Sequence, residues 1–296
     1  MTSQHPETPG RKLTAHNQEG GGRNKTQALV YIVTFIGCII FLFPFASMIS
    51  TSLKSYAEAK SLPVQLIPRV IRWSNYREAI RLAPFFWRWM LNSAFLSLVP
   101  TVGIVLASSM AGYAFARLRA PFKNQLFAIV LATLMLPTTA MVVPIFLFWR
   151  SFHAIGTYWP LILPFFCGDA FNVFLFRQFF AGMPKELEDA AIMDGCSRFR
   201  IWWAIFLPNS FPVIATSAIW FFNWRWNEYL TPRFFLNAME TYPLSVGLTV
   251  AYSKDMMTPI QLVSVAAVIF TIPTIIIFAL GQKYLTQGFV TSGLKG

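Results

Sequence analysis

The sequence predicts an all-α integral membrane protein with six transmembrane helices. Of its 296 residues, 12% are charged and 55% are hydrophobic, and the mean hydropathy is +0.52. Soluble domains usually carry about 25% charged residues. The apolar stretches are long and continuous, whereas the strands of a membrane barrel alternate over about 10 residues. These observations together favour membrane-spanning helices.

The spans can be located from the stretches that contain no charged residue, because a helix needs about 20 apolar residues to cross the hydrocarbon core. Five stretches meet this length directly: 26–53, 89–116, 124–149, 201–224 and 256–282. A sixth stretch, 158–180, is interrupted by one carboxylate, Asp169. Pro137, Pro144, Pro160, Pro164 and Pro273 lie within or at the ends of spans. We expect them to kink the helices.

The chain divides into a polar tail, residues 1–27, and a membrane domain, residues 28–296. The apolar run begins only at Ala28 and is too long for a cleaved secretory signal. We therefore interpret the tail as disordered and cytoplasmic, followed by an uncleaved span. Six spans put both termini on one side of a cell inner membrane. The Lys and Arg residues are divided almost equally between the two sides of the membrane, but the basic tail and the short basic turn at 117–123 favour cytoplasmic termini.

Other features of the sequence limit the possible chemistry. The cysteines Cys38, Cys167 and Cys196 have neither disulfide nor zinc spacing, which favours a role in packing. The chain has no phosphate-binding G-x-x-x-x-G-K-[ST] loop, so any nucleotide must bind a partner. The predicted outer loop, 54–88, is rich in Lys and Arg. It is either a landing surface for an acidic partner or a set of interfacial charges beside Trp73, Trp87 and Trp89.

The most distinctive segment is a polar, carboxylate-rich island at residues 183–208. Pro184 suits the first turn of a helix, and Glu186, Glu188 and Asp189 would then meet the positive end of its dipole. Gly195 is placed to end that helix in a left-handed cap. Ser197 can cap a second helix, whose apolar face is Trp202, Ile205 and Phe206.

This island is either an amphipathic segment lying on the inner leaflet or a docking element for a soluble partner. An interfacial helix would be expected to carry lysine and arginine where this segment carries Glu186, Glu188 and Asp189. The acidic face therefore favours a protein partner. On this interpretation, Glu188→Lys would meet a basic group of the partner, and a bulky residue at Gly195 would disturb coupling or assembly.

The run Glu186-x-Glu188-Asp189-Ala190-Ala191-x-x-Asp194-Gly195, with nine residues to Ile205-x-Leu207-Pro208, resembles the coupling motif of ABC importer permeases. Residues 28–296 resemble the carbohydrate-importing branch of this family, in particular the second permease subunit of maltose importers. Its further matches are Thr51-Ser52-Leu53-Lys54, Asn75-Tyr76, Ala111-Gly112-Tyr113-Ala114-Phe115-Ala116-Arg117, Trp226-Asn227-Glu228 and Gly293-Leu294-Lys295-Gly296.

The resemblance implies the six-span type I importer permease fold with a cytoplasmic coupling helix. It implies a homologous permease subunit as partner, two ATP-binding subunits that hold ATP and magnesium, and a solute-binding protein that delivers a sugar or oligosaccharide. The chain itself would be no enzyme, would hold no cofactor or metal, and would bind lipid but no nucleic acid. The residues implied in coupling are Glu186, Glu188, Asp189, Ala190, Ala191, Asp194, Gly195, Leu207 and Pro208.

A substrate pathway is expected where polar groups lie at membrane depth, because such groups are costly there. Asp169 and Asn172 are one helical turn apart, and they either line the pathway or stabilise a helix interface. A second cluster lies near the outer end of the fifth span and could serve a sugar or anchor the helix at the interface. Its candidate members are Asn223, Trp226, Asn227 and Glu228.

Three other functions compete with a sugar importer. An integral membrane enzyme would need a catalytic cluster, and of the three histidines two lie in the tail. A stand-alone secondary transporter would often show inverted repeats, and none is evident. A permease for a non-sugar solute remains open at this stage, because nothing in the sequence selects the substrate.

Overall fold

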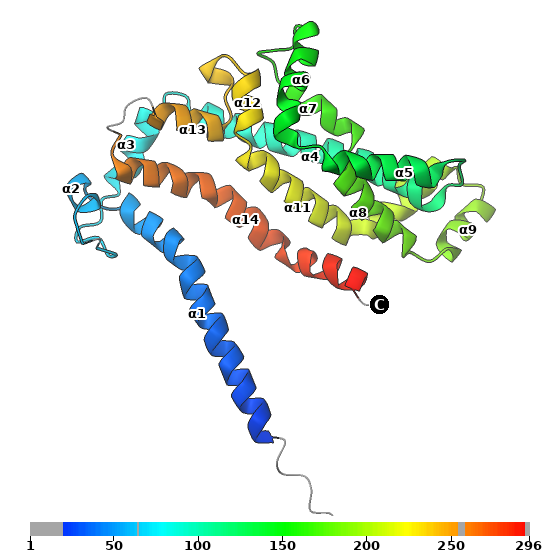
Figure 1. Cartoon of the computed structure of the whole chain (residues 1–296), viewed down its shortest axis with the longest axis horizontal. Helices are drawn as coiled ribbons and strands as arrows, with labels where there is room; N and C mark the ends of the chain where they lie inside the picture. Colours follow the sequence, from blue (N-terminus) through cyan, green and yellow to red (C-terminus); the bar gives the residue numbers. More distant parts are fainter. Residues whose placement is uncertain (1–19, 64, 254–257, 294–296) are drawn as a thin grey trace, which may run out of the picture.

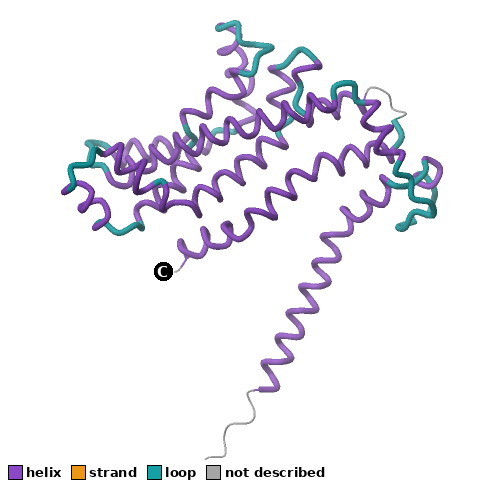
Figure 2. Tube along the Cα trace, turned by 180° about the vertical axis from the view of Figure 1, so that it is seen from behind, coloured by secondary structure: helices purple, strands orange, loops and turns teal. Residues whose placement is uncertain are grey.

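The computed structural model describes residues 20–63, 65–253 and 258–293, and these residues form helices and loops with no strand (Figures 1 and 2). Four helical stretches are long and apolar enough to span a membrane, and two bent helix pairs raise the number to six. This confirms the predicted fold class. The four unbent stretches are Gln27–Ser52, Phe86–Arg117, Trp159–Ala181 and Ile260–Tyr284.

The third predicted span, 124–149, is not one continuous helix. α5 (Lys123–Ala132) and η1 (Thr133–Met135) are separated from α6 (Thr138–Ser151) by a bend of 101°. The cause is Pro137, since a proline forces the preceding residue out of the helical region. Leu136 accordingly has an extended backbone, with ψ 121°. Pro137, one of the prolines expected to kink a helix, therefore interrupts the helix completely.

The fourth span is also interrupted, at the position of Asp169. α7 (Trp159–Ile162) and η2 (Leu163–Cys167) end before Gly168, and α8 (Ala170–Ala181) begins after Asp169. Gly168 has φ +79°, a conformation that side-chain-bearing residues seldom adopt. The sequence suggested that Asp169 lies in the middle of a continuous helix. In the structure it lies at the start of α8 instead.

The fifth span is preceded by short helical turns. α9 (Glu186–Met193) is followed by α10 (Arg198–Ile201), the π-helix η3 (Trp202–Phe206) and η4 (Pro208–Ser210). α11 (Phe211–Asn227) then crosses the bundle, bent by 45° from the α10–η3 segment. The predicted span 201–224 is therefore not one continuous helix, because it contains the break at Leu207 between η3 and η4.

The centre of the bundle is α4 (Phe86–Arg117), which packs between α8 and α11 (Figure 1). One apolar cluster includes Trp89 and joins α4 to α12 (Leu230–Phe235) and α13 (Leu244–Ser253). A second cluster includes Phe176 and Phe206 and joins α4 to α8 and η3. The second cluster therefore connects the short helices between α8 and α11 to the spans.

α1 (Gly20–Ser52) stands away from the bundle along most of its length in both views (Figures 1 and 2). None of its most apolar window is buried. Its helix begins at Gly20, within the predicted tail 1–27, whereas its membrane-spanning stretch begins at Gln27; residues 1–19 lie outside the described part. Cys38 on α1 is exposed, as is Cys167, so these two cysteines are not packing residues in this chain.

The loop 54–88 contains α2 (Tyr56–Ala59) and α3 (Ser74–Leu82). Lys54 is only 2% exposed, and its ammonium group donates to the carbonyl of Gln65. Trp89 is fully buried, whereas Trp73 and Trp87 are exposed. Lys54 and Trp89 are therefore parts of the folded interior and belong neither to a landing surface nor to an interfacial belt.

Candidate functional site

The helix α9 lies at one end of the bundle, and α2, α3 and α13 lie at the opposite end (Figure 1). Its first hydrogen bonds run to the carbonyl of Lys185, from the N–H groups of Glu188 at 2.9 Å and Asp189 at 3.0 Å. Lys185 is therefore the N-cap, and Pro184 precedes the helix instead of lying in its first turn. Proline in this position still blocks any extension of the helix toward α8.

The end of α9 confirms the predicted caps. Gly195 has φ +75°, and its N–H donates to the carbonyl of Ile192 at 3.0 Å. The N–H of Cys196 donates to the carbonyl of Ala191 at 3.0 Å, which satisfies another helix-end acceptor. The Ser197 hydroxyl accepts from the N–H of Arg200 at 3.3 Å and so starts α10. The segment is thus a defined helix–turn–helix.

The predicted coupling residues on α9 divide between two faces of the helix. Glu186, Asp189 and Ala190 are exposed, and Met193, which follows on the same face, is 86% exposed. Glu188 and Ala191 point the other way and are 8% and 5% exposed. An exposed face that combines acidic, small and apolar side chains can bind a protein surface at close range.

Glu188 points into the permease and is enclosed by two arginines. Its Oε1 lies 2.5 Å from Nη1 of Arg198, and its Oε2 lies 4.0 Å from Nη1 of Arg117. The Glu188 and Arg117 side chains are 10% and 6% exposed, whereas that of Arg198 is 53% exposed. Within this chain the Glu188 carboxylate is therefore directed at internal arginines, whereas the sequence interpretation had it facing a partner. Sequence reasoning missed both arginines as its partners, because they lie in other helices.

Arg117 also fastens the end of α8. Its Nε and Nη2 donate to the carbonyl of Phe180 at 3.1 and 2.6 Å, and Nη2 donates to the carbonyl of Met183 as well. The last carbonyls of a helix have no partner within the helix. The guanidinium group further lies 5.1 Å from the ring centroid of Phe206 in η3. One side chain of α4 thus contacts α8, α9 and η3.

Leu207 and Pro208, the last predicted coupling residues, lie at the turn into α11. The N–H of Leu207 donates to the carbonyl of Trp202 at 2.8 Å, which closes the π-helical turn. Leu207 is partly buried against the second apolar cluster, and Pro208 is exposed. Their place in the structure is at the bend between η3 and α11, away from the exposed face of α9.

Asp169 and Asn172 are brought together, in a helix cap. Asp169 Oδ1 accepts from the N–H of Asn172 at 3.0 Å, and Asp169 Oδ2 accepts from the Asn172 amide. Asn172 is 2% exposed, and its Oδ1 accepts from the hydroxyl of Ser217 in α11 at 2.5 Å. The backbone N–H of Asp169 donates to Ser108 in α4 at 3.3 Å. These contacts place the pair at a helix interface.

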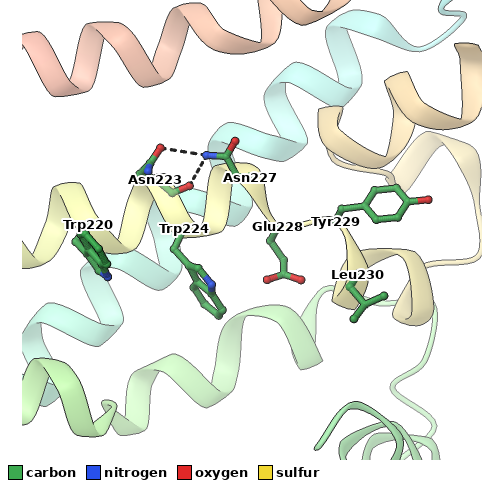
Figure 3. A pocket seen from close by; sticks show the side chains of 7 residues that line it. All are labelled: Trp220, Asn223, Trp224, Asn227, Glu228, Tyr229 and Leu230. Atoms are coloured by element: carbon green, nitrogen blue, oxygen red, sulfur yellow. Dashed lines mark hydrogen bonds between the residues drawn. The ribbon is translucent and has the colours of Figure 1, made fainter. Parts of the chain in front are cut away.

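A pocket of about 590 Å³ lies beside the end of α11, where the second polar cluster was expected (Figure 3). In Figure 3, Trp220, Trp224 and Glu228 point to one side of the helix. The amide of Asn227 donates to the carbonyl and to Oδ1 of Asn223, at 2.8 and 3.1 Å. The lining residues are Trp220, Asn223, Trp224, Asn227, Glu228, Tyr229 and Leu230.

Trp226 does not line this pocket, although it was a predicted pathway residue. It is 2% exposed, and its indole N–H donates at 3.0 Å to the carbonyl of Phe270 in α14 (Ile260–Gly293). Asp169 and Asn172 do not line it either. A second pocket, of about 450 Å³, shares Asn227 and Tyr229 with the first. Four lining residues were not among the predicted pathway residues: Trp220, Trp224, Tyr229 and Leu230. The i, i+4 spacing of Trp220 and Trp224 with Glu228 could have indicated the two tryptophans.

Arg225 is a buried cation, 5% exposed, whose guanidinium group lies 5.7 Å from the ring centroid of the pocket residue Trp224. Its Nη2 donates to the carbonyl of Leu161 at 3.1 Å, and its Nε donates to the carbonyl of Leu96 at 3.4 Å. The guanidinium group also lies 4.9 Å from the ring centroid of Phe165. A single side chain of α11 therefore joins α4 and α7 next to the pocket.

A bundle of candidate membrane-spanning helices, with a capped helix–turn–helix exposed at one end, is the architecture of a multi-pass membrane protein. The chain belongs to the family of binding-protein-dependent transport system inner membrane components, whose model matches residues 101–290. It is therefore the permease component of an ABC importer and no enzyme, because ATP hydrolysis takes place on a separate subunit. A secondary transporter and a membrane enzyme are accordingly not favoured.

Similar proteins cover nearly the whole chain. The arabinooligosaccharides transport system permease protein AraQ of Bacillus subtilis (strain 168) is 33% identical, over 87% of this chain and 92% of its own length. The sn-glycerol-3-phosphate transport system permease protein UgpE of Yersinia pestis bv. Antiqua is 31% identical, over 88% and 95%.

Among solved structures, a chain of a bacterial ABC transporter involved in the import of the acidic polysaccharide alginate superimposes with a TM-score of 0.76. It is 25% identical, and the match covers 92% of this chain and 99% of that one. Together, family and fold identify a multi-pass inner membrane permease that works with an ATPase, a solute-binding protein and a second permease.

Proposed function

We propose that this chain is one half of the permease of a carbohydrate importer and carries a saccharide inward by alternating access. Its partners would be a homologous permease, two ATP-binding subunits that hold ATP and magnesium, and an extracytoplasmic solute-binding protein. Both termini would be cytoplasmic, and the α9 end of the bundle would face the ATP-binding subunits. Closure of those subunits would move α9 and switch the spans between inward and outward openings.

The names of the relatives support a saccharide as substrate. They include permeases for arabinooligosaccharides, sulfoquinovosyl glycerol, polygalacturonan or rhamnogalacturonan, and lactose. These compounds share sugar rings rich in hydroxyl groups. The name of another relative gives a substrate without a sugar ring, sn-glycerol-3-phosphate, and this substrate contains a phosphate group.

The pocket at the end of α11 favours an uncharged saccharide over an acidic one. Its polar lining consists of two amides, a phenol and one carboxylate, and it contains neither Lys nor Arg. The exposed indole faces of Trp220 and Trp224 can stack on a sugar ring, and the amides can exchange hydrogen bonds with its hydroxyl groups. The carboxylate of Glu228 would repel an acidic sugar at this position.

The observation that carries the coupling part of the proposal is the exposed face of α9, residues Glu186, Asp189, Ala190 and Met193. In a chain that is 55% hydrophobic, these residues form an acidic, solvent-exposed helix beyond the spanning bundle. Ala190 is small enough to allow close approach of a partner surface. The carboxylates on either side offer partners for basic groups.

The proposal is tested by reconstitution. The chain is co-expressed with the neighbouring permease and ATP-binding genes, and the purified complex is placed in liposomes with the cognate solute-binding protein outside. Neutral and acidic oligosaccharides are then compared as substrates. We expect uptake of a neutral saccharide that requires both ATP and the binding protein. Failure of the ATP-binding subunits to copurify, or uptake without ATP, would contradict the proposal.

A further inference from the structure

We infer that Glu188, Arg117 and Arg198 form a clip that ties the docking helix α9 to the ends of α4 and α8, so that these elements move together. The inference rests on the proposed coupling role of α9. It concerns how a displacement of α9 reaches the spans, and it assigns Glu188 a positioning role inside the permease in place of a contact with the ATP-binding subunit.

The first step of the argument is that apolar contacts alone hold α9 weakly. Of its eight residues, Glu188 and Ala191 are the buried ones, and the turn before it contains exposed Pro184 and Lys185. A methyl group from Ala191 contributes little area to the second apolar cluster. The strongest attachment of the helix is therefore the charged contact of Glu188 with Arg198 at 2.5 Å and its proximity to Arg117 at 4.0 Å.

The second step is that the clip is shielded from solvent on its inner side. The Arg117 side chain is 6% exposed, and the carboxylate of Glu188 is 10% exposed. Opposite charges interact more strongly in such surroundings than at a surface, and salt screens them less. Removal of the carboxylate would leave the Arg117 cation without a charged partner among the described residues.

The third step is that α4 and α8 form a stiff pair on which the clip can act. Arg117 holds the carbonyls of Phe180 and Met183 at the end of α8. Five residues before Arg117, a Cβ at Gly112 would lie 2.6 Å from the Cβ of Phe176 and 2.9 Å from the backbone N of Arg177, so the two helices are closely packed there. At the other end of α8, Ser108 accepts from the N–H of Asp169 at 3.3 Å.

The last step leads from α8 to the pocket. Asn172 on α8 accepts from Ser217 on α11, and α11 continues to Trp224 at the pocket. Coupling between distant sites requires packed elements that shift as units. The contacts Glu188–Arg117, Arg117–Phe180 and Asn172–Ser217 form such a series, with α9 at one end and the pocket at the other.

The experiment measures saccharide taken up per ATP hydrolysed in liposomes that contain the complete transporter. The variants are Glu188→Gln, Arg198→Gln and the double variant. The matched control is Arg200→Gln, which removes the same charge from the same short helix. The Arg200 side chain is exposed and forms no ion pair with the described residues. Copurification of the ATP-binding subunits is measured for each variant.

We expect Glu188→Gln and Arg198→Gln to retain the ATP-binding subunits and ATP hydrolysis but to lower uptake per ATP by about two- to thirtyfold. The double variant should be no worse than Glu188→Gln, because both changes open the same clip. The control should keep the wild-type ratio.

Two results would overturn the clip: an unchanged ratio for Glu188→Gln, or a loss of ATP-binding subunits that fully accounts for the lost uptake. In the second case Glu188 would serve folding or docking. These results differ from failure of the proposed function itself, which would appear as a wild-type complex without ATP-dependent uptake.

Discussion

Gly112 of α4 and Phe176 of α8 lie so close that a Cβ added to the glycine would be 2.6 Å from the Cβ of the phenylalanine. The nearest atoms also include the backbone N of Arg177 at 2.9 Å, so the contact cannot be relieved by rotating a side chain. Small residues at helix crossings in membranes allow this kind of approach. The α4–α8 pair therefore depends on the absence of a side chain at one position.

Gly112→Ala should destabilise the protein by about 1–3 kcal/mol, because the added methyl group overpacks the α4–α8 contact. The measurement is the midpoint of thermal unfolding in detergent. Gly37→Ala in α1 is the matched control, since nothing lies within 4 Å of a Cβ at Gly37. Equal midpoints for the two variants would show that α4 can move away from α8 without cost.

Gly195→Val should weaken the turn after α9 through backbone strain alone. The residue has φ +75°, and nothing lies within 4 Å of an added Cβ, so crowding is not involved. The left-handed conformation costs a side-chain-bearing residue about 1–2 kcal/mol. Asparagine tolerates this conformation better, so Gly195→Asn should retain more of the copurifying ATP-binding subunit than Gly195→Val. The reverse order would rule out strain as the cause.

Arg225→Met should lower the thermal midpoint although it removes a buried charge. The carbonyls of Leu96 and Leu161 lose a charged donor, and a hydrogen bond of that kind contributes about 1.5–3 kcal/mol. Arg150→Met, at an exposed position, is the matched control. A higher midpoint for Arg225→Met would mean that desolvation of the guanidinium group outweighs its hydrogen bonds.

Trp224→Ala should affect mainly uptake, whereas Trp226→Ala should affect mainly stability. Trp224 is 45% exposed at the pocket, so its loss should reduce uptake or raise the apparent KM while the thermal midpoint stays near that of wild type. Trp226 is 2% exposed, and its truncation should cost about 3–5 kcal/mol of stability. A stable Trp226→Ala protein with defective uptake would instead place that indole on the pathway.

The sequence predicts what depends on composition and local geometry. Long apolar stretches predict the spans, and the glycine at 195 and the serine at 197 predict their caps because each acts within a few residues. Pro137 indicates a kink, but not that α5 and α6 meet at 101°. That angle depends on how both halves pack against the rest of the bundle.

The sequence fails where the face of a helix is decided by distant residues. Glu188 and Asp189 are adjacent and alike, yet one is buried because arginines from α4 and α10 lie on its side. Asp169 was placed mid-span because no break was expected there, although Gly168 before it is a residue that often ends helices. Arg225 directly follows the charge-free stretch 201–224, and only the packed structure reveals its carbonyl partners.

The position of α1 has a consequence for how this permease is made. None of its most apolar window is buried against the bundle. A helix in lipid satisfies its own backbone groups, so it requires no tertiary neighbour to persist. Its apolar surface costs nothing there, since lipid chains are as apolar as leucine. Synthesis can therefore leave α1 in the bilayer as a finished helix that meets its neighbours later, by diffusion within the plane of the membrane.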